Sequence, residues 1–250
     1  MLKVIVSGCN GKTGRVLFDC VKEDTELELV CGIARSASSC PDEGIKIYPS
    51  ISEVTESADV IIDFSHHSTL DGLLEYSLRT KTPLVLATTG YDDEDLKKIH
   101  EASKNIPIFL SYNMALGVNI LIKLVKEAAK LLEGFDIEIV EKHHNRKADA
   151  PSGTAIMIAD GIKEALPEVE NTYGRHGRSA KRQPNEVGIH AIRGGTIVGE
   201  HDVIFAGDNE VVTLSHKSQS NIIFANGSIV AAKYLVKQKP GFYNMNDLLG

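Results

Sequence analysis

The stretch LKVIVSGCNGKTG at positions 2–14 decides the fold. Residues 2–6 form an unbroken apolar run with β-branched side chains, which is typical of a strand buried on both faces of a parallel sheet. A glycine-rich turn follows at once, RVLFDCV at 15–21 has helical spacing, and LELVCGIA at 27–34 is a second apolar run. A strand, a helix and a strand in this order predict a βαβ unit.

The same alternation continues as far as residue 113. Further strands are predicted at 59–65, 83–90 and 106–113, and helices at 50–58, 68–80 and 92–105. Strands that alternate with helices over this length predict a Rossmann-type α/β fold with a doubly wound parallel sheet.

Beyond residue 113 the pattern changes. A long amphipathic helix at 119–134 leads into the alternating strand FDIEIVEKH at 135–143. Three runs within 189–218 have the character of antiparallel strands joined by Gly and Asp-Asn turns, and the tail from residue 224 is predicted to be a helix that ends at Pro240. This part of the chain predicts an α+β domain with a mixed, mainly antiparallel sheet.

Composition and charge restrict the class of partner. The 250 residues are 42% hydrophobic and carry a formal net charge of −7, so the average surface field disfavours nucleic acid and anionic membranes. There is no secretory signal and no run of eighteen apolar residues, so we expect neither export nor a membrane span. A basic stretch at 171–188 is expected to be a solvated loop, with a functional patch as the alternative; its cations are Arg175, Arg178, Lys181 and Arg182.

The four cysteines point to the compartment. Cys9, Cys20, Cys31 and Cys40 lie about ten residues apart, without a CxxC pair or the spacing of a zinc site. They are interpreted as small core residues of a protein from a reducing compartment, which favours the cytoplasm.

The glycine turn between the first strand and the first helix is a candidate dinucleotide site. There the backbone can approach a pyrophosphate and the N–H groups of the helix can point at it. The spacing is GxxGxxG and the usual fingerprint is GxGxxG, so a merely tight turn remains an alternative; a P-loop is excluded because GKT lacks the four-residue gap. After the second strand, Ala34 and Arg35 offer no carboxylate for ribose hydroxyls but one guanidinium for a 2′-phosphate. NADPH is therefore favoured and NADH is possible, while an exposed Arg35 without a ligand stays open.

The segment EKHHNRKADAPSGTA at 141–155 concentrates proton-transfer and anion-binding groups. His143 or His144 can pass a proton near neutral pH, and Lys147 can hold a carboxylate or donate a proton. The residues at 152–154 open a helix, whose free N–H groups suit a second anion. A purely structural loop is one alternative; zinc is disfavoured because no third ligand stands at suitable spacing.

This segment resembles the E-x-H-H-x-x-K-x-D-A-P-S-G-T-A signature of the 4-hydroxy-tetrahydrodipicolinate reductase (dihydrodipicolinate reductase) family. The resemblance covers the whole chain. It includes the glycine turn, Ala87-Thr88-Thr89-Gly90, Asn113, Val198-Gly199-Glu200-His201 and Phe224-Ala225-Asn226-Gly227.

The resemblance implies NAD(P)H-dependent reduction of 4-hydroxy-tetrahydrodipicolinate, by way of dihydrodipicolinate, to tetrahydrodipicolinate in the diaminopimelate and lysine pathway. It implies a small cyclic dicarboxylate substrate and a cytoplasmic homotetramer. It also implies a dinucleotide-binding domain at 1–113 with 220–250, and a substrate-binding and oligomerisation domain at 114–219.

The family's site residues are carried over by matching positions. The resemblance implies that His143 and Lys147 are catalytic and that His144, Gly153 and Thr154 bind substrate, without a metal. The implied cofactor residues are Gly8, Cys9, Asn10, Gly11, Lys12, Thr13, Ala34, Arg35, Ala87, Thr88, Thr89, Ser111, Tyr112, Asn113 and Met114. The departures from the family pattern are Ala34 for an acidic residue, Ala87 for a glycine and Asn221 for an arginine.

Two rival functions stay open. A related NAD(P)-dependent amino acid dehydrogenase of the 2,4-diaminopentanoate type would be expected to lack the His-His-Lys and Pro-Ser-Gly-Thr groups, both of which are intact here. A catalytically inactive nucleotide sensor would bind the cofactor without oxidising it.

Overall fold

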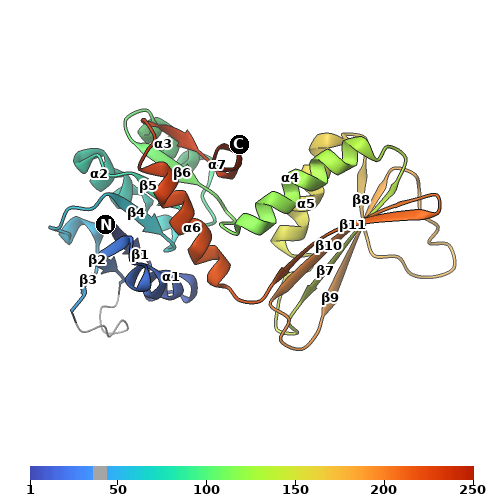
Figure 1. The fold of residues 1–250 in the computed structure, drawn as a ribbon, viewed down its shortest axis with the longest axis horizontal. Coiled ribbons are helices and arrows are strands. Elements are labelled where there is room, and N and C mark those ends of the chain that lie inside the picture. The colour runs from blue at the N-terminus through green and yellow to red at the C-terminus, as the bar shows by residue number, and fades with distance from the viewer. Residues whose placement is uncertain (36–43) are drawn as a thin grey trace. The chain divides into compact units, whose positions relative to one another are not determined.

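A seven-stranded parallel sheet forms the centre of the first of two units. The computed structural model describes residues 1–35 and 44–250, and the first unit comprises Met1–Leu116 and Ile222–Gly250. The strand order is β12-β6-β5-β4-β1-β2-β3, with every neighbouring pair parallel (Figure 1). The strands are β1 (Leu2–Ser7), β2 (Leu27–Ile33), β3 (Lys46–Tyr48), β4 (Val60–Asp63), β5 (Leu84–Leu86), β6 (Pro107–Leu110) and β12 (Gly241–Tyr243).

Helices cover both faces of this sheet because successive strand residues point to opposite sides. Val4 and Val6 pack in one buried cluster with residues of the helices α1 and α6, whereas Ile5 packs in another with residues of α2 and α3. The predicted doubly wound fold is thereby confirmed. The helices of this unit are α1 (Lys12–Glu23), α2 (Leu70–Thr80), α3 (Asp93–Ser103), α6 (Ile222–Leu235) and α7 (Met245–Leu249), with 3-10 turns η2 (Ile51–Glu53) and η3 (His67–Thr69).

The prediction of a helix at 50–58 is wrong beyond the first turn. Only η2 forms, and the chain continues in an extended conformation from Val54. The carboxylate of Glu56 accepts hydrogen bonds from the Tyr48 hydroxyl at 2.6 Å and from the Thr55 N–H at 3.1 Å. Such side-chain bonds to nearby groups compete with helical backbone bonds.

The second unit, Gly117–Asn221, contains a five-stranded mixed sheet. Two helices, α4 (Leu116–Leu131) and α5 (Gly153–Ala165), contribute to its buried cluster; for example, Val125 and Ile158 share it with Ile139. The strand order is β11-β10-β7-β9-β8, with β7 (Asp136–His143), β8 (Glu170–Tyr173), β9 (Glu186–Arg193), β10 (Gly199–Gly207) and β11 (Glu210–Ser218).

The predicted mixed sheet is confirmed, but one part of the expected antiparallel set is wrong. β10 pairs antiparallel with β11 and with β7, and Asn209, at φ 65°, makes the predicted turn of the β10–β11 hairpin. β9, in contrast, is parallel to β7 and β8, so the glycines after it do not close a hairpin. The strand β7 takes the place between β9 and β10, where its side chains Ile137 and Ile139 become buried.

The three cysteines that the structure describes are free thiols. Cys9 and Cys31 are buried thiols and Cys20 is partly buried, whereas Cys40 lies outside the described residues. Within the two described stretches of the chain, none of the helices combines the length and the hydropathy that crossing a bilayer requires.

Candidate functional site

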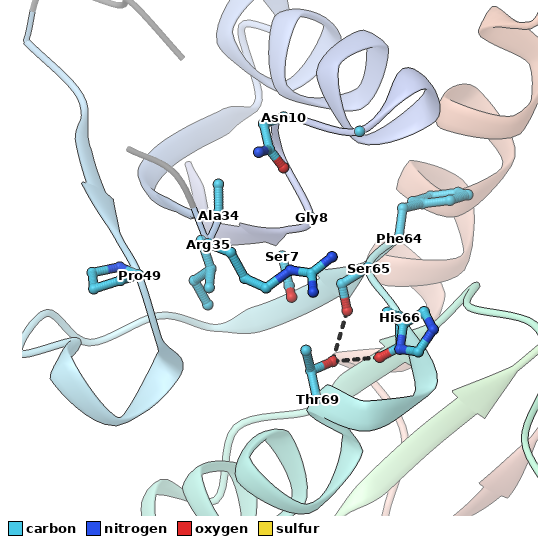
Figure 2. A pocket seen from close by; sticks show the side chains of 12 residues that line it. Ser7, Gly8, Asn10, Ala34, Arg35, Pro49, Phe64, Ser65, His66 and Thr69 are labelled. Carbon is cyan, nitrogen blue, oxygen red and sulfur yellow. Dashed lines mark hydrogen bonds between the residues drawn. The ribbon is translucent and has the colours of Figure 1, made fainter. Parts of the chain in front are cut away.

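A cavity of about 230 Å³ lies in the first unit at the carboxyl ends of β1, β2 and β4. In parallel α/β sheets this edge is where ligands bind. Figure 2 shows side chains that surround it, among them Arg35, which reaches into the space. The lining residues are Ser7, Gly8, Asn10, Gly11, Ile33, Ala34, Arg35, Pro49, Phe64, Ser65, His66 and Thr69.

Two glycines allow the turn before α1 to be tight. Gly8 has φ 79°, and a Cβ there would lie 2.5 Å from the backbone oxygen of Phe64. A Cβ on Gly14 would lie 2.0 Å from the oxygen of Gly8, so only glycine lets the helix approach the turn.

The beginning of α1 is open to an anion. Its N-cap residue, Gly11, provides no side-chain hydrogen bond, whereas α3 and α5 are capped by the side chains of Asp92 and Ser152. The N–H groups of the first turn of α1 are therefore left to a ligand. Among the residues that the structure describes, the cavity lining contains no carboxylate and includes the guanidinium of Arg35, so these residues fit a phosphate-bearing dinucleotide.

The structure brings together only part of the predicted cofactor set. Gly8, Asn10, Gly11, Ala34 and Arg35 line this cavity. The other predicted residues, Cys9, Lys12, Thr13, Ala87, Thr88, Thr89, Ser111, Tyr112, Asn113 and Met114, do not line it.

The residues outside the lining fall into three groups. Lys12 and Thr13 lie in the first turn of α1. The side chain of Cys9 faces the core, because a Cβ on Gly32 would lie 2.7 Å from its Sγ, so only its backbone can meet a ligand. The stretches 87–89 and 111–114 follow β5 and β6 at the same edge of the sheet.

Sequence reasoning missed several lining residues that follow β4. Phe64, Ser65 and Thr69 belong to the cavity. The signal that points to them is topological. β4 is parallel to β1, so the residues after β4 lie at the same sheet edge as the glycine turn.

A buried carboxylate organises the second unit's site. Glu141 on β7 is fully buried, and its Oε2 lies 2.6 Å from Nδ1 of His143 on the same strand face. Arg193 at the end of β9 donates one bond to each carboxylate oxygen, both at 2.7 Å. The backbone N–H of Ser152 donates to Oε1 at 3.0 Å. One carboxylate thus holds the histidine and the start of α5.

The charge state of Glu141 follows from these partners. Burial by itself raises the pKa of Glu141, but the hydrogen bonds from Arg193, His143 and Ser152 outweigh it and hold the pKa below its ordinary value. The ionised carboxylate can only accept, so Nδ1 of His143 carries the hydrogen and Nε2 is left for a ligand. Gly199 leaves room there, since a Cβ would lie 3.1 Å from that Nε2.

The loop after β7 places a lysine next to this group. The chain turns after the two histidines, with the N–H of Lys147 donating to the oxygen of His144 at 3.1 Å. The Nζ of Lys147 lies 2.8 Å from Oδ1 of Asp149, and Arg193 donates to the backbone oxygen of Asp149 at 2.7 Å. The same arginine therefore ties the loop to Glu141.

The start of α5 presents backbone donors. Ser152 is its N-cap and accepts from the N–H of Ala155 at 3.2 Å, while Gly153 and Thr154 form the first turn. A Cβ on Gly153 would meet no atom within 4 Å, so packing within the chain does not require a glycine at this position. Space is therefore left for a ligand against the backbone.

His201 is a neighbour that sequence reasoning did not assign to the site. It is buried, its Nε2 lies 3.1 Å from Oγ of Ser152, and its ring packs edge-on against His143 with centroids 5.3 Å apart. Burial, and then the proximity of His143, lowers the pKa of His201 to about 4, so the ring is neutral. The β7–β10 register, which sets His201 opposite Glu141, is the signal that points to it.

The basic stretch at 171–188 is engaged within the chain at two of its cations. Arg175 and Arg182 both pair with Glu138, and His190 contacts the same carboxylate at 2.6 Å. In the part of the chain that the structure describes, no group of three His, Cys, Asp or Glu side chains is arranged to hold a metal ion.

Comparisons with known proteins cover both units. The family models described as dihydrodipicolinate reductase, N-terminus, and dihydrodipicolinate reductase, C-terminus, match residues 2–114 and 117–249. A 4-hydroxy-tetrahydrodipicolinate reductase of Caldanaerobacter subterraneus subsp. tengcongensis is 56% identical, over 100% of this chain and 98% of its own length. One from Clostridium tetani is 47% identical, over 100% of this chain and 97% of its own.

A solved structure has the same fold. The dipicolinate-bound dihydrodipicolinate reductase from Paenisporosarcina sp. TG-14 matches 98% of this chain and 99% of its own, with a TM-score of 0.84 at 23% identity. The models and relatives, which span both units, agree on one family. The chain belongs to the dihydrodipicolinate reductase family.

Proposed function

We propose that this chain is an NAD(P)H-dependent 4-hydroxy-tetrahydrodipicolinate reductase. It reduces the hydroxylated cyclic imine, by way of dihydrodipicolinate, to tetrahydrodipicolinate in the diaminopimelate and lysine pathway. Family membership and the names of the two relatives support this reaction. The observation that carries the proposal is the Glu141–His143 pair, joined through Ser152 to the start of α5 and followed by Lys147.

The first unit holds the dinucleotide in this proposal. The turn from Gly8 to Thr13 binds the pyrophosphate with backbone N–H groups, and residues 87–89 and 111–114 meet the nicotinamide half. The bound dinucleotide supplies the hydride. Arg35, which lines the cavity beside the uncharged Ala34, favours NADPH over NADH because a guanidinium can donate two bonds to a 2′-phosphate.

The second unit holds a cyclic dicarboxylate. The Paenisporosarcina protein is described as dipicolinate-bound, and dipicolinate carries two carboxylates on one ring. Lys147 and His144 take one carboxylate, and the N–H groups of Gly153 and Thr154 with the Thr154 hydroxyl take the other. Two fixed anions hold the ring in one orientation, and orientation of this kind contributes up to several kcal/mol to catalysis.

His143 transfers the proton that the reduced ring requires. Glu141 fixes the ring through Nδ1, so Nε2 is the nitrogen that exchanges a proton with the substrate. Lys147 is the second proton donor. Arg193 neutralises Glu141 in the buried site and keeps the histidine and the loop in place.

The decisive assay follows the oxidation of NADPH and of NADH separately, with substrate freshly made from pyruvate and aspartate semialdehyde. We expect His143→Gln to lower turnover by roughly 10²–10⁴-fold with a much smaller change in KM. Lys147→Ala should damage both kcat and KM, because this side chain binds as well as donates.

His190→Gln is the matched control for His143→Gln. Its Nε2 lies 2.6 Å from Glu138, so this variant also breaks a His–Glu contact of the same sheet. Glu138 and Glu141 are three residues apart on one strand and therefore point to opposite faces. Normal turnover in His143→Gln, or an equal loss in His190→Gln, contradicts the assignment. If the unaltered protein binds NADPH but does not oxidise it, the alternative of a catalytically inactive nucleotide sensor would be favoured.

The remaining expectations are part of the same proposal. The second unit is the substrate-binding and oligomerisation domain, the protein is a homotetramer, and it acts in the cytoplasm. Sedimentation equilibrium tests the tetramer, and a mass equal to one chain would contradict it.

A further inference from the structure

Asp63 is a buried carboxyl group in the first unit whose hydrogen-bond partners are all neutral. It ends β4 between Ser7 of β1 and Leu86 of β5, and its side chain has no exposure. Thr88 Oγ1 lies 2.6 Å from Oδ2, Ser65 Oγ lies 2.5 Å from Oδ1, and the Ser7 side chain and the Ser65 backbone N–H also bond to the carboxyl group. The carboxyl group therefore joins three strand ends at the edge that carries the dinucleotide cavity.

A count of hydrogens favours one charge state of this group. Ser65 Oγ contacts Asp63 Oδ1 and also lies 2.7 Å from Thr69 Oγ1, which lies 2.9 Å from the backbone oxygen of His66. All three are hydrogen-bond distances, and Figure 2 shows two of them beside the cavity, from Ser65 to Thr69 and from Thr69 to His66. Each hydroxyl has one hydrogen and a carbonyl only accepts. The hydrogen of Thr69 goes to His66, that of Ser65 goes to Thr69, and the third comes from Asp63.

An ionised Asp63 satisfies fewer of these contacts. Ser65 would then donate to Asp63 and Thr69 to Ser65. The 2.9 Å contact between Thr69 Oγ1 and the His66 oxygen would then have no hydrogen, and that oxygen would accept from the Thr69 N–H alone. The charge would also be buried with only neutral donors, and a buried charge needs an opposite charge or a metal nearby.

The electrostatic surroundings act in the same direction. Burial raises the pKa of Asp63 against the lowering effect of its hydroxyl partners. The titratable neighbour that faces it is Tyr91, on the chain after β5. Burial raises the pKa of that phenol, so it is neutral as well.

We infer that Asp63 is a neutral carboxylic acid and a positioning residue of the dinucleotide cavity. Its proton begins a chain through Ser65 and Thr69 to the His66 carbonyl, and its other oxygen accepts from Thr88. The acid fixes the directions of hydroxyls that line the cavity and keeps negative charge away from a phosphate ligand. This inference rests on the proposed binding of a dinucleotide.

Asp63→Asn tests the inference because an amide has the shape and donor pattern of the neutral acid. Its NH₂ can donate to Ser65 and its oxygen can accept from Thr88. We expect the Kd for NADPH to stay within about threefold of wild type, whereas Asp63→Leu, which loses both bonds, should raise it by about tenfold or more. Equal weakening in the two variants overturns the inference.

Infrared difference spectra read the protonation state directly. The wild-type protein at neutral pH should show the carbonyl band of a protonated carboxylic acid, and Asp63→Asn should lose it. Asp59→Asn, at an exposed residue just before the same strand, should lose carboxylate bands only. Absence of the acid band from the wild type overturns the inference, whether or not Asp63→Leu folds.

The pH dependence of stability gives a third readout. A group with a raised pKa in the folded state contributes stability below its unfolded pKa and loses it as the pH rises through the folded pKa. Asp63→Asn should therefore gain in Tm relative to wild type as the pH rises, and a constant difference overturns the inference. If the wild type binds no NADPH, the proposed function fails, but the infrared and Tm readouts still decide the state of Asp63.

Discussion

The two units each bury a carboxyl group at the end of a strand, and the two groups differ in their partners. Asp63 has neutral hydroxyl and backbone N–H partners, and burial raises its pKa; Glu141 is equally buried, yet Arg193 and His143 lower its pKa. The difference is a guanidinium: Arg193 donates two hydrogen bonds directly to Glu141 and keeps it an anion, and Asp63 has no such partner among the described residues. Apart from Arg35, the described residues that line the candidate dinucleotide cavity can thus be neutral, while the candidate substrate site is organised by fixed charges.

The strongest way to break this comparison is to remove the cation from Glu141. Arg193→Met leaves a buried carboxylate without an opposite charge, and we expect the free energy of unfolding to fall by about 3–5 kcal/mol in urea denaturation. Glu141→Gln combined with Arg193→Met should recover much of this stability but not the turnover.

The exposed pair Lys126–Glu164 supplies the control for that experiment. Lys126→Ala should cost about 0–1 kcal/mol, as surface ion pairs do. If Arg193→Met lowers the free energy of unfolding by no more than this, Glu141 can be protonated in the folded protein as readily as Asp63. The contrast between the two carboxyl groups would then disappear.

A second prediction uses the neutral histidine of the charged site. The pKa of His201 is lowered by burial from 6.5 to about 4. Between these two pKa values the unfolded chain binds a proton at this histidine and the folded chain does not. The free energy of unfolding therefore falls by about 3 kcal/mol as the pH drops from above 6.5 to 4. His201→Gln should flatten this part of the profile in urea titrations, and the exposed His176→Gln should not. Parallel wild-type and His201→Gln profiles would contradict the prediction.

A third prediction concerns Arg35, a cation in the lining of the candidate dinucleotide cavity. Arg35→Ala should raise the KM for NADPH about tenfold or more, because charge-assisted hydrogen bonds contribute about 1.5–3 kcal/mol. The KM for NADH should change little, since that dinucleotide lacks the 2′-phosphate. An equal rise for both dinucleotides would show that Arg35 does not recognise that group.

The smallest effect on stability is expected at the start of α5. Gly153→Ala introduces a methyl group into open space, so the free energy of unfolding should stay within about 0.5 kcal/mol of wild type. The KM for the dicarboxylate should nevertheless rise severalfold while the KM for NADPH is unchanged. A large loss of stability would mean that the glycine serves the fold and not the ligand.

The sequence predicts local features of the fold well. The apolar run before Gly8, the helix after it and the alternating strand that ends at His143 each follow from spacing within one segment. The strand β12 is three residues long and the pairing partners of β9 lie far away in sequence, so no local periodicity reports on either. Tertiary packing decides both.

The same division applies to the candidate sites. His143, Lys147 and Gly153 are found from one segment because fifteen consecutive residues carry the pattern. Arg193 reaches Glu141 across 52 residues, through the parallel register that sets it beside His143, and Thr88 reaches Asp63 across 25. A single sequence shows the charged groups but not which strand ends meet, so it cannot assign these partners.

The first unit is made of two segments that are distant in the chain, and this affects its biosynthesis. Residues 222–250 supply α6, whose buried side chains Ala225 and Ile229 complete the cluster around α1, and β12, which pairs with β6. During translation the second unit, a single stretch, has emerged in full while the sheet of the first still lacks its edge strand. Until residues 222–250 are synthesised, the first unit therefore has β6 unpaired on one side and an apolar surface uncovered. Unpaired strand edges and exposed apolar surface are features that chaperones bind.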